Sequence, residues 1–151
     1  MMLATAFAAL AQLATPTLQV LDEVAARHLV APGARTKVIA LWSLDCGYCD
    51  AHLRALDTLA RNGAPLDVAI VATDGAERSE AAAAHLAALQ LGSSSTWIYA
   101  EAASPRIGYR LDPEWGGELP RTIVIDPDAR RSRSGVLSEV QWKQLLGVSP
   151  E

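Results

Sequence analysis

The sequence predicts one α/β domain in which a central sheet is covered by helices on both faces. The chain has 151 residues, which is the size of a single domain. Short apolar runs rich in strand-forming residues alternate with segments whose apolar residues recur at helical spacing. No internal repeat, low-complexity linker or second domain interrupts this alternation. The pattern is therefore typical of a single sheet whose strands are connected by helices.

Strands and helices alternate in the first two thirds of the chain. Each expected helix ends at a Gly or Pro, and each expected strand is a short apolar run bounded by polar residues. The alanine-rich helix carries His85, which we expect at the surface. In chain order we expect a helix at 20–29, a strand at 36–43, a helix at 46–62, a strand at 66–72, an alanine-rich helix reaching Leu91, and a strand at 96–100.

The last third is expected to begin with an irregular region at 104–119, which is rich in Gly and Pro. A strand at 121–126 then turns into an antiparallel partner at 131–136. The pattern Ser138-x-x-Gln141 is a capping box that starts a final helix, and Gly147 stops it. The order is β-α-β-α-β followed by β-β-α, which predicts one sheet containing parallel and antiparallel strands.

The charge balance argues against a nucleic-acid partner. Lys and Arg number 13 against 17 Asp and Glu, whereas nucleic-acid-binding domains usually carry a basic stripe. The one basic cluster, Arg130, Arg131 and Arg133, is interpreted as a solvated turn in preference to a phosphate site. No apolar stretch reaches the about 18 residues that a membrane-spanning helix needs, so no stable membrane span is predicted.

Both cysteines of the chain lie in one segment, Cys46-Gly47-Tyr48-Cys49. Two cysteines placed at random in this length show that separation in about one arrangement in a hundred, so the spacing calls for an explanation. A disulfide framework is excluded because no further cysteine exists to pair. The alternatives to a redox pair are two inert core thiols or half of a zinc site.

The predicted strand at 36–43 leads directly into this Cys-x-x-Cys segment, which opens a helix. We expect Cys46 at the N-cap and Cys49 at the third helical position, so that unpaired N–H groups and the positive dipole end face the Cys46 sulfur. These groups stabilise a thiolate and lower its pKa, and only the thiolate attacks a disulfide. Residues three apart share a helix face, so Cys49 is placed to resolve the mixed disulfide that Cys46 forms.

Four polar neighbours of the cysteines are each open to two interpretations. Asp45 and Asp50 raise the pKa of the attacking thiol through their negative charge, or they form a solvated rim. Tyr48 tunes the redox couple or contacts a partner protein. His52 lies three residues after Cys49, and it either accepts the proton that Cys49 loses during resolution or is an exposed helix histidine.

Two motifs, at 41–49 and 117–127, resemble the thioredoxin superfamily, and in particular the bacterial TlpA/ResA-like branch of thiol–disulfide oxidoreductases. The first reads Leu-Trp-Ser-Leu-Asp-Cys-Gly-Tyr-Cys, with a Trp four residues before the first cysteine as in the family. The second matches the family's Pro-x-Thr-x-x-x-Asp stretch at Pro120, Thr122 and Asp126. The resemblance covers 24–146 and implies a thioredoxin-like fold, with a central mixed sheet and helices on both faces.

The resemblance also implies how substrate is held. It implies a cis Leu119–Pro120 bond facing the cysteines, a kind of bond that usually has a purpose. Pro120 would shape the substrate groove and keep metal off the dithiol, and the backbone of Leu119 would pair with an extended substrate segment. Trp115, in the loop before Pro120, is expected to form part of a docking surface or to anchor that loop.

The activity implied by the resemblance is exchange of a Cys-Gly-Tyr-Cys dithiol with disulfides of partner proteins, in the reducing direction. It needs an upstream redox donor and no organic cofactor. Four departures from the family pattern bear on that direction: Asp45 replaces the usual Trp, Tyr48 the usual Pro, His52 the Glu common in this branch, and Ala40 the buried Asp of thioredoxin.

The N-terminal segment bears on location. Residues 1–15 are expected to form a signal peptide or an N-terminal helix, and 16–151 the thioredoxin-like domain. The first 21 residues carry no charged side chain, and Ala9-Leu10-Ala11 offers small residues for cleavage, but no Lys or Arg precedes the apolar run. Export would place the dithiol in an oxidising compartment, so we expect a periplasmic location in preference to a cytoplasmic one.

Two other functions remain open for the same residues. A zinc- or copper-handling module would use Cys46, Cys49 and His52, although a structural zinc site wants four ligands. A thiol peroxidase is suggested by Ser43, three residues before Cys46, but the upstream proline expected of peroxiredoxins is missing.

Overall fold

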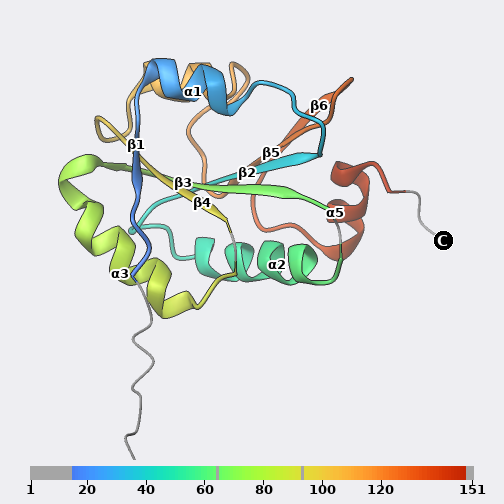
Figure 1. Cartoon of the computed structure of the whole chain (residues 1–151), viewed down its shortest axis with the longest axis horizontal. Helices are drawn as coiled ribbons and strands as arrows, with labels where there is room; N and C mark the ends of the chain where they lie inside the picture. The colour runs from blue at the N-terminus through green and yellow to red at the C-terminus, as the bar shows by residue number, and fades with distance from the viewer. Residues whose placement is uncertain (1–14, 64, 93, 149–151) are drawn as a thin grey trace, which may run out of the picture.

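The computed structural model describes residues 15–63, 65–92 and 94–148, and it contains one six-stranded mixed sheet between two layers of helices (Figure 1). The strand order is β1-β4-β3-β2-β5-β6. The first four of these run parallel, β5 is antiparallel to β2, and β6 is antiparallel to β5. The strands are β1 (Gln19–Leu21), β2 (Lys37–Trp42), β3 (Asp67–Gly75), β4 (Ser95–Tyr99), β5 (Arg121–Ile125) and β6 (Arg130–Ser134). The α/β fold class with a mixed sheet is confirmed.

The helices cover both faces of the sheet, as predicted. They are α1 (Glu23–Leu29), α2 (Cys49–Arg61), α3 (Ser79–Leu89), α4 (Pro105–Leu111) and α5 (Glu139–Leu146), with a 3-10 turn, η1 (Ala76–Arg78), before α3. In Figure 1, α1 lies above the sheet, α2 and α3 lie below it, and α5 lies at the right of the view. Side chains of β2 alternate between the two resulting cores: Val38 and Trp42 join α2, α3 and α5, whereas Ile39 and Leu41 join α1 and α4. Because both faces of β2 are buried, every residue of this strand after Lys37 is apolar.

The prediction of a helix at 20–29 was wrong at its start. Residues 19–21 form β1, an edge strand that pairs in parallel with β4. Leu21 is buried while its neighbour Val20 is 55% exposed. Side chains that alternate between buried and exposed from one residue to the next are typical of a strand and not of a helix. Helix α1 begins at Glu23, after Asp22 caps it by accepting a hydrogen bond from the Ala25 N–H at 2.8 Å.

The region 104–119, predicted to be irregular, contains α4. The helix starts at Pro105, a position where the missing N–H of proline costs nothing. Gly108 lies in its interior because the ring of Trp115 packs against it, and an added Cβ would meet that ring at 3.2 Å. Gly108 is therefore not a loop residue: it lets the Trp115 side chain approach the helix closely.

The predicted capping box of the last helix is confirmed. The Gln141 N–H donates to the Ser138 hydroxyl at 3.3 Å, and the Ser138 N–H donates to the Gln141 side chain at 2.9 Å. Gly147 ends the helix in the left-handed conformation, with φ +69°. This helix closes one of the two cores.

Strand register brings three distant segments together at one edge of the sheet. The parallel strands β2 and β3 end there, and the antiparallel β5 begins there, with Leu41 opposite Arg121. The segment after Trp42, the end of β3 at Gly75, and the residues before Arg121 therefore meet. Both cysteines lie in the first of these segments and Pro120 lies in the last.

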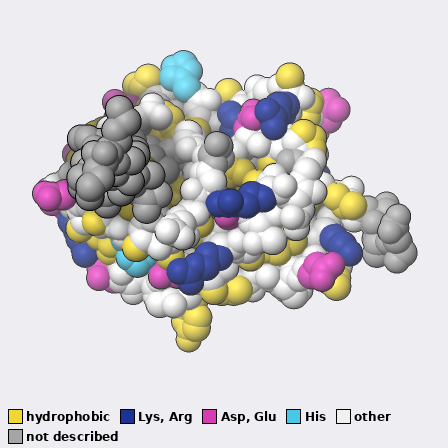
Figure 2. Space-filling model, turned by 60° about the horizontal axis from the view of Figure 1, so that its bottom comes forward, with side chains coloured by type: hydrophobic (Ala, Val, Ile, Leu, Met, Phe, Trp, Pro, Cys, Tyr) yellow, Lys and Arg dark blue, Asp and Glu magenta, His cyan; other side chains and the backbone are white. Residues whose placement is uncertain are grey.

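The surface carries charges of both signs. On the face drawn in Figure 2, Lys and Arg side chains lie in separate groups, with acidic and hydrophobic side chains between them. The basic cluster of Arg130, Arg131 and Arg133 lies on strand β6 and not in the expected turn. The Arg131 guanidinium pairs with Asp126 and donates to the Leu145 carbonyl at 2.7 Å, so this residue stabilises the fold. Among the helices that the structure describes, none has both the length and the apolar character needed to cross a bilayer. The predicted export signal lies outside the described residues.

Candidate active site

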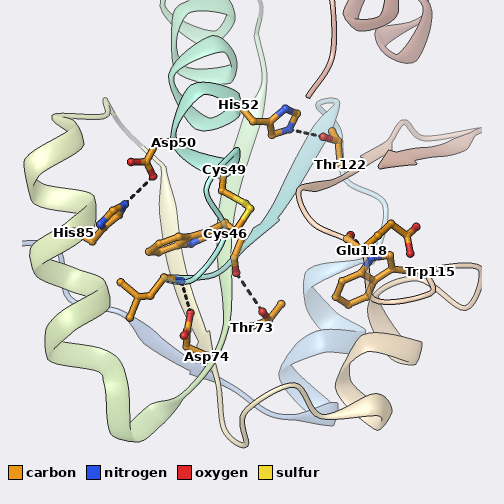
Figure 3. The surroundings of a disulfide bond; sticks show 12 residues. Cys46, Cys49, Asp50, His52, Thr73, Asp74, His85, Trp115, Glu118 and Thr122 are labelled. Carbon is orange, nitrogen blue, oxygen red and sulfur yellow. Dashed lines mark hydrogen bonds and ion pairs between the residues drawn. A yellow bond between two sulfur atoms is a disulfide. The ribbon is translucent and has the colours of Figure 1, made fainter. Parts of the chain in front are cut away.

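The two cysteines form a disulfide, with their Cα atoms 5.5 Å apart. The disulfide lies at the sheet edge described above, between β3 and the loop that precedes β5 (Figure 3). Cys46 is partly exposed, whereas Cys49 is completely buried. Cys46 is therefore the more accessible of the two cysteines.

The helix after the disulfide starts later than predicted. Tyr48, and not Cys46, is the N-cap of α2, and Cys49 is its first residue. The Cys49 N–H donates to the Cys46 carbonyl at 3.3 Å, and the Cys46 N–H donates to the Ser43 carbonyl at 3.1 Å. These bonds between residues three apart close two tight turns, so the α-helical pattern begins only after them. Cys46 nevertheless precedes the positive end of α2 by one turn.

A buried carboxylate holds the segment before Cys46. Asp74, near the end of β3, has a side chain only 3% exposed, and it accepts a hydrogen bond from the Leu44 N–H at 2.9 Å. Arg78 lies 2.6 Å from the other oxygen of Asp74 and 3.1 Å from Asp45. Asp74 and Arg78 were not among the predicted site residues, because the strand was expected to end at residue 72, whereas β3 continues to Gly75. The signal that could have identified Asp74 is an acidic residue at the carboxyl end of a parallel strand.

A second unpredicted contact joins α3 to the start of α2. The His85 imidazole lies 2.7 Å from the carboxylate of Asp50, the residue that follows Cys49. The same imidazole stacks on the buried Trp42 ring, with the ring centroids 5.4 Å apart. His85 is only one-third exposed, so the expectation of a surface histidine misses its role as a contact between helices. Asp50 is bound to a neighbour and is not simply a solvated rim residue.

His52 is completely buried, which excludes the alternative of an exposed helix histidine. Its Nε2 lies 2.7 Å from the Thr122 hydroxyl on β5, and its ring stacks on Trp142 at 5.1 Å. Figure 3 shows the imidazole directed at Thr122. Burial lowers the pKa of His52 to about 4, so the ring is neutral at pH 7. Among the described residues, Nδ1 has no hydrogen-bond partner.

The loop before β5 carries the remaining predicted residues. The Leu119–Pro120 bond is cis, as the resemblance implied, and Pro120 is buried. Leu119 is half-buried and packs against both cores. The indole N–H of Trp115 donates to the Glu118 carbonyl at 2.7 Å, which anchors the loop. Tyr48 is 74% exposed, whereas the other predicted site residues are buried or half-buried.

A buried ion pair fixes the ends of this loop to each other. Both Nε and Nη2 of Arg121 donate to one oxygen of Asp112, at 3.0 and 2.7 Å, and both side chains are less than 10% exposed. Burial by itself raises the pKa of Asp112, but the hydrogen bonds led by Arg121 outweigh it and hold the pKa below its usual value. The pair sets the position of the residues that lead into Pro120.

The structure therefore brings Cys46, Cys49, Leu119 and Pro120 to one sheet edge and turns His52 toward Thr122. Within the described ranges, no group of three or more His, Cys, Asp or Glu side chains is arranged to hold a metal ion.

Comparison with known proteins identifies the fold. No model of a known protein family matches the chain, and no curated protein matches it. Among solved structures, a thioredoxin-related protein from Neisseria meningitidis serogroup B superposes with a TM-score of 0.59 at 20% identity, over 78% of this chain and 86% of its own.

Two further structures are similar. A secreted disulfide oxidoreductase from Mycobacterium tuberculosis has a TM-score of 0.54 at 14% identity, over 76% of this chain and 81% of its own. An exposed lipoprotein thioredoxin from Streptococcus pneumoniae has a TM-score of 0.57 at 18% identity, over 76% and 84%. At these identities the likeness concerns the fold, which is thioredoxin-like.

Proposed function

We propose that this protein is a thiol–disulfide oxidoreductase whose Cys46–Cys49 pair exchanges with disulfides of partner proteins. The observation that carries the proposal is the unequal exposure of the two cysteines. A partly exposed Cys46 next to a fully buried Cys49 suits one residue for attack and the other for resolution. Their position beside the cis Leu119–Pro120 bond supports the same assignment.

The exchange balances as two substitutions at sulfur. The Cys46 thiolate attacks a substrate disulfide, so that a Cys46–substrate S–S bond forms and the released substrate thiolate takes a proton from solvent. The Cys49 thiol gives up its proton and attacks the Cys46 sulfur. The intramolecular disulfide forms, and the second substrate sulfur leaves as a thiol. Two electrons pass from the protein to its substrate.

In this proposal His52 takes up the Cys49 proton transiently during resolution. It lies one turn further along α2, and its Nδ1 has no partner among the described residues. Because burial keeps its pKa near 4, the ring is neutral at pH 7 between cycles, and one of its nitrogens is able to accept a proton.

The surface residues are assigned to substrate contact. The backbone of Leu119 pairs with an extended segment of the substrate, and Pro120 holds that backbone in place. Tyr48 contacts the partner from the helix side, and its high exposure supports this role. Trp115 contacts it from the loop, while its indole N–H keeps the loop anchored.

We assign the reducing direction, with an upstream dithiol protein as the donor that restores the two thiols. The location we propose is outside the cytoplasm, in the periplasm. The support is that two of the similar structures are described as secreted and as an exposed lipoprotein. A fusion of the full chain to alkaline phosphatase, which is active only after export, tests the location.

The activity is tested with reduced protein and insulin as a disulfide substrate, following the thiols released. We expect the native protein to reduce insulin, Cys46→Ser to be inactive, and Cys49→Ser to accumulate a mixed disulfide visible by mass. Insulin reduction that persists in Cys46→Ser contradicts the proposal. The direction is tested by titration against glutathione, for which we expect a potential of about −200 mV or below; a value near about −120 mV overturns the reducing assignment.

The two rival functions give different results in the same preparation. Zinc or copper(I) that stays with the protein through gel filtration, without insulin reduction, indicates a metal-handling module. Rapid consumption of hydrogen peroxide without a protein disulfide substrate indicates a thiol peroxidase. Either result replaces the proposed function.

A further inference from the structure

A cavity of about 340 Å³ opens beside the candidate active site, within the size range of small-molecule and side-chain pockets. We call it the Tyr99 pocket. It lies between the ends of β3 and β4, the helix α4 and the loop that precedes Pro120. Ten residues line it: Thr73, Tyr99, Ala103, Ser104, Pro105, Gly108, Tyr109, Trp115, Gly116 and Gly117.

Thr73 connects this pocket to the cysteine segment. Its hydroxyl donates to the Trp42 carbonyl at 3.3 Å, and its own carbonyl accepts from the Ala103 N–H at 2.8 Å. The same residue is thus bonded to the strand that leads to Cys46 and to the segment that forms the pocket rim. In the view of Figure 3, Thr73 lies between the segment that carries the cysteines and the Trp115 ring. Thr73 therefore joins the wall of the pocket to the strand that leads to Cys46.

The pocket walls define the chemistry of an occupant. None of the ten lining residues carries a charge, and aromatic rings of Tyr99, Tyr109 and Trp115 form a large part of the wall. A charged side chain entering it loses hydration without gaining an ionic partner, which is costly. An aliphatic or aromatic side chain instead removes apolar surface from water on both sides.

The floor of the pocket also carries an unused polar group. The Tyr99 side chain is 1% exposed, and its hydroxyl has no hydrogen-bond partner among the described residues. It converges with the Trp115 ring on Gly108: an added Cβ there would lie 3.2 Å from the ring and 3.7 Å from the hydroxyl. Buried polar groups are nearly always paired, so this enclosed hydroxyl gains an acceptor, such as a peptide carbonyl, where an occupant of the pocket moves the Trp115 ring aside and brings one.

We propose that the Tyr99 pocket binds an uncharged apolar side chain, aromatic or branched aliphatic, next to the reacting cysteine of the protein substrate. The inference rests on the proposed function for the identity of the occupant. Such a pocket makes the protein select among substrate disulfides according to the residue that neighbours the substrate cysteine. Tyr109, 62% exposed at the rim, and Trp115 are the residues that set this preference.

The test uses short peptides that carry one cysteine as a glutathione mixed disulfide, with Phe, Leu, Gly, Glu or Lys as the neighbouring residue. Their rates of reduction are divided by the rate with glutathione disulfide itself, so that changes in Cys46 reactivity cancel. We expect Phe and Leu peptides to react about tenfold faster than Gly, Glu or Lys peptides. The preference should fall at least threefold in Tyr109→Ala and in Trp115→Ala.

Val140→Ala is the matched control, because Val140 is also 62% exposed but lies on α5 and does not line the pocket. It should keep the full preference. Equal normalised rates for all five peptides, or a preference that survives both pocket variants, overturns the proposal.

A binding measurement separates this proposal from the proposed function. The oxidised protein is titrated with the same peptides, each carrying Ser in place of Cys, while the indole N–H signal of Trp115 is followed by NMR. A shift with Phe and Leu peptides, weakened in Tyr99→Phe, supports the pocket even if no disulfide is reduced. No shift with any peptide, together with equal exchange rates, overturns the pocket while insulin reduction stands unaffected.

Discussion

The carboxylate of Asp74 accepts a hydrogen bond from the backbone N–H of Leu44, two residues before Cys46, across 30 positions of sequence. This one bond ties the end of β3 to the segment that presents the reactive sulfur. The carboxylate is almost completely buried, and Arg78 balances its charge. The position of Cys46 therefore depends on a group that neither cysteine contacts.

Asp74→Ala should destabilise the protein and slow exchange. The Leu44 N–H is left without its acceptor, which costs about 1–3 kcal/mol in the free energy of unfolding, and Cys46 loses its fixed position. Urea unfolding and the rate with glutathione disulfide measure the two effects. Glu139→Ala is the control, because Glu139 is 81% exposed and pairs only with Lys143 at 3.1 Å, so its loss should cost less than about 0.5 kcal/mol. Equal costs for both variants would contradict the assignment.

Arg78 and Asp45 should change the reactivity of Cys46 in opposite directions. Arg78→Met leaves two carboxylates, Asp45 and Asp74, without their cation, and this negative charge disfavours a nearby thiolate. Alkylation of reduced Cys46 by iodoacetamide at pH 7 should slow by about threefold. Asp45→Asn removes a negative charge and should speed it. A change of the same sign in both variants would show that charge is not the cause.

The stability of the protein should fall in mildly acidic solution because of His52. Its pKa is about 4 in the folded chain against 6.5 in an unfolded one, so between these values the unfolded state binds the extra proton. The stabilisation that depends on a neutral ring is complete above pH 6.5 and is lost as the pH falls toward 4, about 3 kcal/mol in total.

His52→Gln isolates this effect because glutamine does not titrate. The difference in unfolding free energy between the native protein and the variant should shrink by about 2–3 kcal/mol from pH 7 to pH 4.5, as measured by urea unfolding. A difference that stays constant across this range would mean that the ring is already accessible to protons in the folded state.

The ion pair between Arg121 and Asp112 should be essential for stability. Arg121→Met leaves a buried carboxylate without its partner, which costs about 3–5 kcal/mol at pH 7. Arg110→Met is the matched control: Arg110 is 44% exposed and pairs with Glu23 at 3.3 Å, and its loss should cost less than about 1 kcal/mol. Thermal unfolding compares the two variants. Similar melting temperatures would contradict a structural role for the buried pair.

Local patterns in the sequence predicted most of the elements that carry the site. The apolar run at 36–43, the capping box at Ser138 and the spacing of Cys46 and Cys49 all depend on residues a few positions apart. Such contacts form within one strand, turn or helix, so their signals are local. The prediction failed where one local pattern fits two structures. The apolar pair at 20–21 also fits a helix face but belongs to a strand, and Gly108 also fits a loop but belongs to a helix.

By itself, the sequence determined the fold class, the strand that leads to the disulfide, and the motif around Pro120. Tertiary structure decided which side chains hold the segments on either side of the two cysteines. Asp74, Arg78 and His85 come from β3, η1 and α3, and only strand register and helix packing bring them to α2 and to the segment before it. His52 became a buried, neutral group for the same reason, because β5 and α5 cover it. Burial and pairing across dozens of residues are properties of the packed chain, and no local spacing records them.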